Sequence, residues 1–318
     1  MDSNRNQALL LILASTVLIL IVYLTIPFTP QRKRPEGPTP TPQVQKSWFK
    51  VPGFLQPEIK VLVAGDVMLG RTVMGRSLDS GDPKYPFLKV AERLWKADLT
   101  FVNLENPIVT NCPRQTTSLV FCADPQMLEG LTYSGVDVVT LGNNHSRNYG
   151  QKGLDETQMF LNEKGIAATG LGSLVTKKVA GTTFGFLGFN FVDINPKSSD
   201  YDLVADSDKK VDVLVVGVHW GAEYQATANL RQRKIAAELV KAGADVVVGH
   251  HPHWVQDMEY LDGKPVYYSL GNFIFDQMWS EKTKEGLVVE LTFKDKKLVG
   301  EKKLPIYMRE WAQPQWVE

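Results

Sequence analysis

All five histidines of this 318-residue chain fall in three short motifs. The motifs are Leu-Gly-Asn-Asn-His (141–145), His-Trp-Gly-Ala-Glu (219–223) and Gly-His-His-Pro-His (249–253). Each follows a short apolar run rich in β-branched residues, so the histidines stand where predicted strands end. In layered α/β folds the carboxyl ends of the strands meet at one crevice, and imidazole is a common protein ligand of metal ions. The pattern therefore predicts a metal site.

The third motif carries the strongest signal. His251 and His253 are two residues apart, so in an extended segment both rings face one side and can bind one ion or ion pair. His250 points elsewhere and is expected to support the ligands. His219 ends an apolar strand, and Glu223 four residues on is expected to orient it. A buried histidine satisfied by the backbone is the alternative for His219.

Two carboxylates extend the candidate ligand set. Asp66 follows the first predicted strand in Gly-Asp-Val-Met-Leu-Gly-Arg (65–71), and Glu105 follows the second in Asn-Leu-Glu-Asn-Pro (103–107). Asp66 reaches a metal ion, or it is an ordinary turn or N-cap residue. Glu105 bridges two ions, or it is a solvated side chain beside a proline turn. Asn103 shares the face of Glu105 if the strand continues.

Further side chains are candidates for binding and proton transfer. Asn144 offers a neutral, weak oxygen ligand, and His145 beside it is a candidate general acid. A turn is the alternative for both, since asparagine tolerates left-handed backbone. Arg71 is a candidate clamp for an anionic oxygen, with a solvent-facing position as the alternative. Asn272 and Asp276 are expected to support the ligands by hydrogen bonds.

Composition narrows the function classes. The chain has 35 Lys+Arg and 35 Asp+Glu, and this balance gives no indication of electrostatic binding to nucleic acid. A hydrophobic content of 43% suits a globular body with a sizeable core. The two cysteines, Cys112 and Cys122, lie outside any C-x-x-C spacing. They form either a short-loop disulfide of an oxidising compartment or two unrelated free thiols.

The N-terminal segment predicts attachment to a membrane. Residues 8–28 form an uncharged, strongly apolar run, and about 20 such residues span a bilayer core. The run is longer than a signal-peptide core and no small-residue cleavage site follows, so a retained anchor over 1–29 is favoured over a cleaved signal. A Pro-rich linker over 30–57 follows, and the body is expected over 58–318. The basic cluster at 32–34 favours a cytoplasmic body, whereas a disulfide favours the opposite side.

The elements that would position these residues alternate strands with helices. Strands are predicted at 59–64, 99–104, 136–141, 166–169, 183–189, 211–218, 246–248 and 265–269, with a closing hairpin at 287–293 and 297–308. Helices are predicted at 86–96, 125–134, 154–163 and 230–242. Such alternation indicates an α/β domain with sheets inside and helices outside.

Together the motifs resemble the CapA family of poly-γ-glutamate capsule synthesis proteins. The resemblance covers about 59–278 and rests on six ordered segments, 65–71, 103–107, 142–145, 219–224, 249–253 and 268–276. The family is similar to calcineurin-like metallophosphoesterases, which implies a four-layer αββα sandwich, preceded here by the N-terminal transmembrane helix. It also implies one ion held by Asp66 and His253, a second held by Asn144, His219 and His251, Glu105 as the bridge, and His145 as the general acid.

Two positions depart from these patterns. The phosphoesterases carry a histidine two residues after the first aspartate, where this chain has Met68, so the first ion is expected to lack a strong ligand. CapA-like proteins often carry Asp-Tyr-Gly after the Asn-Asn-His motif, where this chain has Asn148 followed by Tyr-Gly. If that aspartate orients a ligand, the orientation differs here. One or two divalent ions are expected, with Mn, Zn, Fe and Mg left open.

The resemblance implies a membrane-anchored protein of poly-γ-glutamate capsule synthesis or export, acting as a metal-dependent hydrolase on a phosphoester or γ-glutamyl substrate. The alternative is a non-catalytic subunit that binds or exports the anionic polymer with other capsule synthesis subunits. An α/β domain with incidental histidines is a third interpretation, which their clustering disfavours. The link to capsule synthesis favours a single-pass cell-membrane protein with an extracytoplasmic body, and no nucleic-acid partner is expected.

Overall fold

The computed structural model describes residues 57–318. The predicted anchor over 1–29 and all but the last residue of the predicted linker lie outside the described residues. Within 57–318, no helix has the length and apolar character that a bilayer span requires.

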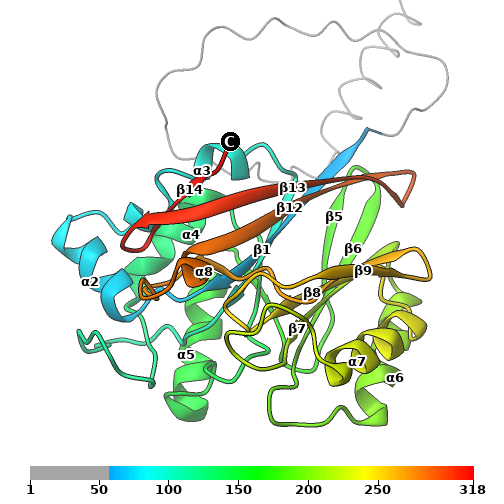
Figure 1. The fold of residues 1–318 in the computed structure, drawn as a ribbon, viewed down its shortest axis with the longest axis horizontal. Coiled ribbons are helices and arrows are strands. Elements are labelled where there is room, and N and C mark those ends of the chain that lie inside the picture. The colour runs from blue at the N-terminus through cyan, green and yellow to red at the C-terminus, as the bar shows by residue number, and fades with distance from the viewer. Residues whose placement is uncertain (1–56) are drawn as a thin grey trace, which may run out of the picture. The chain divides into compact units, whose positions relative to one another are not determined.

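Two β-sheets form the centre of the body (Figure 1). The first has eight strands in the order β14–β13–β12–β1–β2–β3–β4, with β11 beside β1. Strands β1 to β4 run parallel, so their carboxyl ends lie at one edge. The strands are β1 (Ile59–Val67), β2 (Leu99–Leu104), β3 (Val138–Thr140), β4 (Ala167–Thr169), β11 (Asn272–Ile274), β12 (Glu285–Lys294), β13 (Lys297–Glu310) and β14 (Gln313–Trp316).

The second sheet has six strands in the order β5–β6–β7–β8–β10–β9. Strands β6, β7, β8 and β10 run parallel, and β5 and β9 are antiparallel strands at its two edges. The strands are β5 (Val175–Val179), β6 (Thr182–Asn190), β7 (Val213–His219), β8 (Val246–His250), β9 (Met258–Leu261) and β10 (Lys264–Tyr267).

The two sheets pack face to face through the apolar side chains on one side of each strand. Phe101 of β2 stacks on Phe186 of β6 with ring centroids 5.5 Å apart. Phe184 of β6 meets Phe293 of β12 edge-on at 5.3 Å. Gly217 in β7 leaves room for the Phe101 ring, because a Cβ at that position would lie 2.8 Å from Phe101 Cζ. Side chains from both sheets therefore build one shared core.

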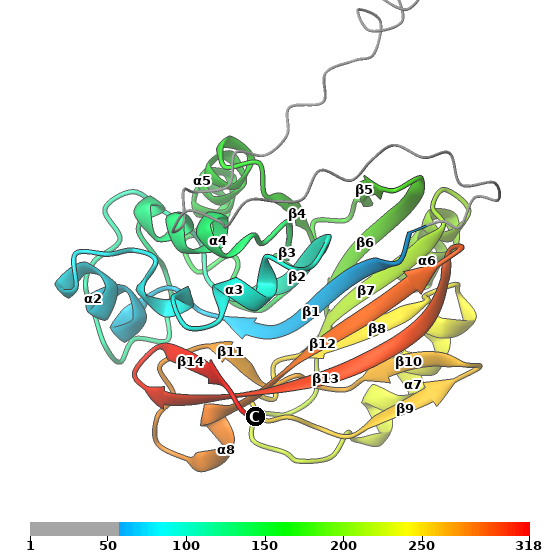
Figure 2. The same ribbon diagram turned by 90° about the horizontal axis from the view of Figure 1, so that it is seen from above.

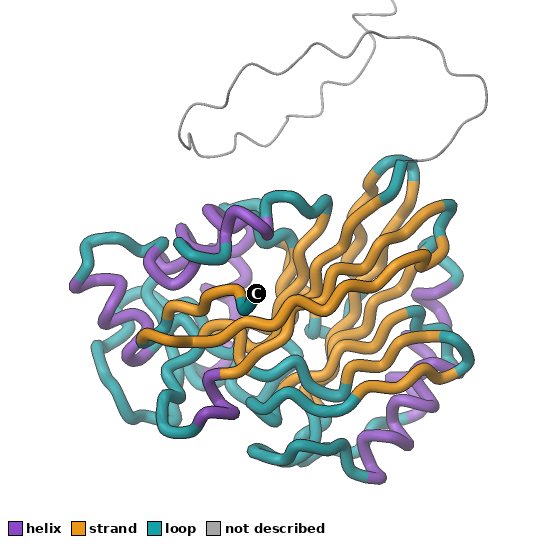
Figure 3. The backbone as a smooth tube through the Cα atoms, turned by 45° about the horizontal axis from the view of Figure 1, so that its top comes forward, coloured by secondary structure: helices purple, strands orange, loops and turns teal. Residues whose placement is uncertain are grey.

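Helices cover the outer faces of both sheets (Figures 2 and 3). Apolar residues of α2 to α5 pack outside the first sheet, and those of α6 and α7 pack outside the second. The fold is therefore mixed α/β with two central sheets, as the alternation indicates. The helical elements are α2 (Arg71–Asp79), η1 (Tyr85–Phe87), α3 (Ala91–Leu94), η2 (Pro125–Met127), α4 (Leu128–Ser134), α5 (Gly150–Glu163), α6 (Ser198–Asp208), α7 (Leu230–Lys241) and α8 (Glu281–Lys284).

The single helix predicted over 86–96 is wrong. The segment divides into the 3₁₀ turn η1 and the short helix α3. Hydrogen bonds from the Phe87 N–H to the Lys84 carbonyl and from the Val90 N–H to the Phe87 carbonyl tighten the backbone to i→i+3 spacing. The apolar face that suggested a helix is nevertheless buried, including Phe87, Val90 and Leu94.

Three further helices, α2, α6 and α8, were not predicted: α8 is a single turn, and α6 carries little apolar periodicity. In α6 only Val204 and Ser207 are buried. Helix α2 begins at Arg71 with a positive φ of 46° and has no side-chain hydrogen bond at its N-cap. Tertiary contacts stabilise α2 and α6 more than local sequence signals do.

Candidate metal centre

Strand ends from both sheets converge on one buried cluster of polar side chains. Asp66 near the end of β1 pairs in register with Asn103 of β2 and Asn272 of β11. In the second sheet, His219 ends β7 and pairs with His250, which ends β8. The convergence predicted from the motif positions is therefore present.

A glycine contact brings two of these segments together. The Asp66 N–H donates to the Gly271 carbonyl at 3.0 Å. A Cβ on the preceding Gly65 would lie 1.9 Å from that carbonyl oxygen. Only glycine permits this approach, so Gly65 allows β1 and the segment that begins β11 to meet beneath the cluster.

Asp66, Glu105 and His253 each offer a ligand atom within 4.8 Å of the other two, and all three side chains are buried. His253 Nδ1 lies 3.4 Å from Asp66 Oδ2, and its Nε2 lies 3.8 Å from Glu105 Oε1. Burial favours the neutral form of Asp66, but hydrogen bonds and charge from His250 and His253 hold the pKa of this carboxyl well below its usual range. Asp66 is therefore ionised, as a metal ligand must be.

Glu105 Oε1 is a buried oxygen without a hydrogen-bond partner among the described residues. It faces two imidazole nitrogens, His219 Nε2 at 3.9 Å and His253 Nε2 at 3.8 Å. Burial raises the pKa of Glu105 well above its usual range, and the charge of Asp66 adds to the rise. An unpaired buried carboxylate is costly unless a cation compensates it. The donor set and this oxygen therefore fit a bound divalent cation.

Asn144, His219 and His251 lie together beside this group. Asn144 Oδ1 is 3.0 Å from His219 Nε2, and the ring centroids of His219 and His251 are 4.8 Å apart. Burial and the charge of His251 hold the pKa of His219 well below its usual range. Burial and the charge of His253 lower the pKa of His251 to about 4. Both rings are therefore neutral near pH 7, which is the form that binds metal.

The extended geometry predicted for His251 and His253 is wrong. Strand β8 ends at His250, and both residues adopt left-handed backbone, with φ values of 95° and 57°. Such conformations cost on the order of 1–3 kcal/mol each and occur at sites that the surrounding structure enforces. The strained turn still brings both rings to the same cluster, with their centroids 6.1 Å apart.

Asn103 takes a central position that its spacing from Glu105 only partly predicts. Its Nδ2 donates to Asp66 Oδ1 at 2.9 Å and lies 3.4 Å from Glu105 Oε2 and 3.3 Å from His219 Nδ1. Its Oδ1 accepts a hydrogen bond from Asn143 Nδ2 at 3.0 Å. One amide thus contacts candidate ligands from both sheets. The sequence signal for this role was the spacing of Asn103 and Glu105, which lie two residues apart and so share a face of the strand.

Two of the expected supporting residues contact the cluster. His250 Nδ1 lies 3.2 Å from Asp66 Oδ1, and Asn272 Oδ1 lies 3.0 Å from His253 Nδ1. Asn272 is held in turn by a hydrogen bond from its Nδ2 to the Thr283 carbonyl at 2.9 Å. Such contacts fix the orientation of ligand side chains.

His145 is oriented by Asn148, the residue that departs from the family pattern. Its Nδ1 lies 2.9 Å from Asn148 Oδ1, which also accepts the backbone N–H of Phe121 at 2.7 Å. Because a backbone N–H can only donate, the Asn148 atom facing both groups is its oxygen. His145 Nδ1 therefore carries a proton, and Nε2 is the atom left for proton transfer. Burial lowers the pKa of His145.

Arg71 is paired with a carboxylate. Its Nε donates to Asp276 Oδ2 at 3.1 Å, its Nη2 binds Asp276 Oδ1, and its Nη1 donates to the Ser118 carbonyl at 3.4 Å. Its guanidinium lies 4.7 Å from the centre of the Phe121 ring. Arg71 therefore links Asp276 to the loop that carries Phe121, and its role as an anion clamp stays a prediction.

Met68 stands where the phosphoesterase pattern, to which the motifs are similar, has a histidine. Its side chain is fully buried in the apolar cluster outside the first sheet, and its sulfur accepts the Gly70 N–H at 3.1 Å. Met68 thus belongs to the packing of α2 and its neighbours, and the ligand that the pattern supplies at this position is replaced by an apolar side chain.

Cys112 and Cys122 form a disulfide. The bond closes the loop that contains Ser118 and ends beside Phe121. Of the two alternatives for these cysteines, the disulfide is therefore confirmed.

Comparison with known proteins places this cluster in a family. Residues 60–277 match the family described as bacterial capsule synthesis protein PGA_cap. The capsule biosynthesis protein CapA of Bacillus anthracis is 30% identical over 267 residues, which cover 75% of this chain and 64% of that protein. The chain thus spans slightly less than two thirds of that relative. The PGA biosynthesis protein CapA of Bacillus subtilis (strain 168) is 28% identical over 270 residues, which cover 77% of this chain and 70% of that protein.

A solved structure shares the fold. A hypothetical protein from Thermus thermophilus aligns with a TM-score of 0.52 and 16% identity, over 78% of this chain and 98% of that chain. At this identity the likeness shows the fold alone. The family match, by contrast, contains every motif that supplies the buried cluster, and the predicted kinship with CapA is confirmed: the chain belongs to the bacterial capsule synthesis family PGA_cap.

Proposed function

We propose that this protein is a divalent-metal-dependent hydrolase of the metallophosphoesterase type that acts in the synthesis of a poly-γ-glutamate capsule. The orphaned Glu105 Oε1 carries the proposal, since it lies within 3.9 Å of two imidazole nitrogens in a fully buried site. Membership of the capsule synthesis family supports the biological setting, and the order of helices, sheet, sheet and helices supports the fold type.

The residues divide into two ligand groups. Asp66 and His253 would hold one ion, Asn144, His219 and His251 would hold a second, and Glu105 would bridge them. Divalent ions supply Lewis-acid polarisation of a phosphoryl or acyl oxygen and an activated water near neutral pH. With Met68 in place of a ligand, the first position is expected to bind its ion more weakly than the second.

The protein contributes proton transfer through His145. With Nδ1 fixed as a donor to Asn148, the protonated imidazole presents its second proton at Nε2. In this form His145 donates that proton to the leaving group as the bond to the substrate breaks. The lowered pKa makes the imidazolium a stronger acid, while a smaller fraction of the side chain is protonated near pH 7.

We also propose where in the cell the protein is located. The apolar run over 8–28 would anchor the protein as a single-pass membrane protein, with the body on the extracytoplasmic side and the capsule synthesis subunits and the anionic polymer as partners. The Cys112–Cys122 disulfide supports this side of the membrane, because such bonds persist in oxidising compartments. The basic cluster at 32–34 favours the opposite orientation.

Metal content and hydrolysis test the proposal together. Elemental analysis of the purified protein is expected to find bound divalent metal that the double variant His251→Ala/His253→Ala loses. The matched variant His145→Ala is expected to keep the metal and lose hydrolysis of a phosphoester and γ-glutamyl panel. Absence of metal from the wild type after reconstitution with Mn, Zn, Fe and Mg would refute the proposal.

The packing of Met68 favours a second candidate, a non-catalytic subunit that holds the polymer. A site with one ligand too few at its first position could keep a single ion for structural support alone. Polymer binding that survives chelation and the His251→Ala change, together with no hydrolysis by the metal-loaded protein, would support this second function.

A further inference from the structure

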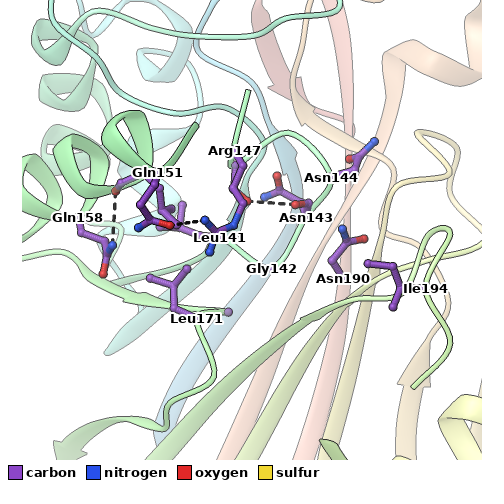
Figure 4. Close-up of a pocket in the computed structure, with 13 residues that line it drawn as sticks. Leu141, Gly142, Asn143, Asn144, Arg147, Gln151, Gln158, Leu171, Asn190 and Ile194 are labelled. Carbon is purple, nitrogen blue, oxygen red and sulfur yellow. Dashed lines mark hydrogen bonds between the residues drawn. The ribbon is translucent and has the colours of Figure 1, made fainter. Parts of the chain in front are cut away.

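A cavity of about 550 Å³ adjoins the metal centre on the Asn144 side. Asn143 and Asn144 form part of its wall, and Asn144 also contacts His219 at 3.0 Å. Other parts of the wall come from α5, from Asn190 at the end of β6, and from Ile194 in the loop after it (Figure 4). A substrate bound at the metal centre would therefore have this cavity beside it.

The polar lining of the cavity contains amides, the Ser146 hydroxyl and one cation, and no carboxylate. Five amide side chains take part, those of Asn143, Asn144, Gln151, Gln158 and Asn190, together with the guanidinium of Arg147. Amides both donate and accept hydrogen bonds, which matches an amide linkage. Helix α5 begins at Gly150 with no acidic residue in its first turn, so the partial positive charge at its start also favours an anion.

Arg147 is the guanidinium that remains available for an anion. Arg71 is held by Asp276 on two nitrogens. The guanidinium of Arg147, in contrast, has only the neutral Gln151 side chain as its hydrogen-bond partner within 57–318, and no carboxylate of these residues pairs with it. A guanidinium without a counter-ion at the edge of a cavity is suited to bind a carboxylate through two parallel hydrogen bonds.

The apolar part of the lining suits an aliphatic segment. Leu141 and Leu154 are buried, whereas Ile194 is 54% exposed. The loop that carries Ile194 is fixed by Arg231, which donates to the carbonyls of Phe191 at 2.6 Å and Ile194 at 2.7 Å. The wall is thus held in place before a ligand binds, which lowers the cost of ordering it.

We propose that this cavity is a binding subsite for a carboxylate-bearing, amide-linked aliphatic segment of the substrate, with Arg147 binding the carboxylate. The statement that the subsite lies beside the reacting bond of the substrate rests on the proposed function. The ligand class of the subsite rests on the lining alone. The subsite would hold the part of the substrate that does not react, and would set its direction across the metal centre.

Binding of γ-glutamylglutamate tests the subsite independently of the metal. Calorimetry on the full-length protein in detergent, with excess EDTA, is expected to show binding of this dipeptide that its triamide, which lacks all of the carboxylates, and inorganic phosphate do not reproduce. Arg147→Gln is expected to weaken the binding at least about tenfold, since it removes a charge-assisted pair. Arg76→Gln, an exposed arginine of α2 outside the lining, is the matched control and is expected to change nothing.

The outcomes separate this subsite from the hydrolase proposal. The double variant His251→Ala/His253→Ala is expected to lose metal yet bind the dipeptide as the wild type does. Dipeptide binding without hydrolysis by the metal-loaded protein would leave the subsite standing and refute the hydrolase. No dipeptide binding by the wild type, or equal affinity in the Arg147→Gln variant, would overturn the subsite whatever the hydrolysis assays show.

Discussion

The phenyl ring of Phe121 stacks on the imidazole of His145, with ring centroids 3.9 Å apart and planes 19° from parallel. Phe121 is buried, and its backbone N–H shares the Asn148 oxygen with His145. The candidate general acid is therefore held on one face by an aromatic ring and at Nδ1 by an amide.

Removing this stack should slow the reaction without removing metal. Phe121→Leu is expected to lower kcat by about 10- to 100-fold, because small displacements of a catalytic group have effects of this size. Steady-state kinetics and elemental analysis of the same preparation check this. Phe293→Leu removes a buried ring from the core between the sheets and should reduce stability but not kcat. Equal kcat losses in the two variants would contradict a positioning role for Phe121.

The pH dependence of hydrolysis should report the partner of His145. Burial holds the pKa of His145 below its ordinary value, so an activity that needs the imidazolium falls as pH rises through that lowered pKa. Asn148→Asp places a negative charge at Nδ1, which stabilises the imidazolium and should move this fall to higher pH. A pH–rate profile that is unchanged in the Asn148→Asp variant would argue against His145 as the acid.

The disulfide should stabilise the fold, and it also closes the loop that carries Phe121. Replacing Cys112 and Cys122 by serine is expected to lower the free energy of unfolding by about 3 kcal/mol. This is the contribution expected when a cross-link that closes a loop of this size restricts the unfolded chain. Denaturant unfolding under oxidising conditions measures it. Addition of a reductant should destabilise the wild type by a similar amount and leave the double serine variant unchanged.

The close approach of β1 to Gly271 makes Gly65 intolerant of a side chain. Gly65→Ala would place a Cβ 1.9 Å from a carbonyl oxygen, and the backbone shift that follows should cost at least about 2 kcal/mol. Gly75→Ala in α2 is the control, since an added Cβ there meets nothing within 4 Å. That change should be neutral or stabilising by about 0.5–1 kcal/mol. Thermal melts of the two variants distinguish the cases.

Asp257 should make the fold sensitive to acid. It accepts the Ala228 N–H at 2.8 Å and pairs with Arg233, and although burial opposes ionisation these contacts lower the pKa of Asp257. The pairing therefore stabilises the fold above the unfolded-state pKa of about 3.9 and loses this contribution as pH falls through the folded value. Asp257→Asn should melt below the wild type at pH 7 and approach it near pH 2. A gap of the same size at both pH values would exclude this linkage.

The candidate ligands at the ends of the strands could be predicted because they lie in short sequence motifs. Asp66, Glu105 and His253 stand shortly after runs whose apolar character predicts strands, and parallel strands place such positions at one edge. The cluster that contains these three residues therefore follows from the sequence with little knowledge of the packing.

Other features depend on contacts that spacing does not encode. The left-handed turn at His251 and His253 arises from the surrounding structure and not from the three-residue motif. Arg71 pairs with Asp276, which lies 205 positions away in the sequence. Spacing in the sequence could not predict this pairing, so the guanidinium was predicted to be free to bind an anion. Helix α6 has a polar sequence with two buried positions, and periodicity alone could not identify it.

The candidate ligands come from two different sheets: Asp66 lies near the end of β1 and Glu105 directly after β2, whereas His219 ends β7 and His253 lies shortly after β8. Ions held by these residues would act as cross-links between the two sheets, and the cross-links would form only when both sheets have folded and docked. Metal saturation would then make the two halves one cooperative unfolding unit, adding about 2.7 kcal/mol of stability at a free-ion concentration 100 times the dissociation constant. The free energy of unfolding would therefore rise with the concentration of free metal ion.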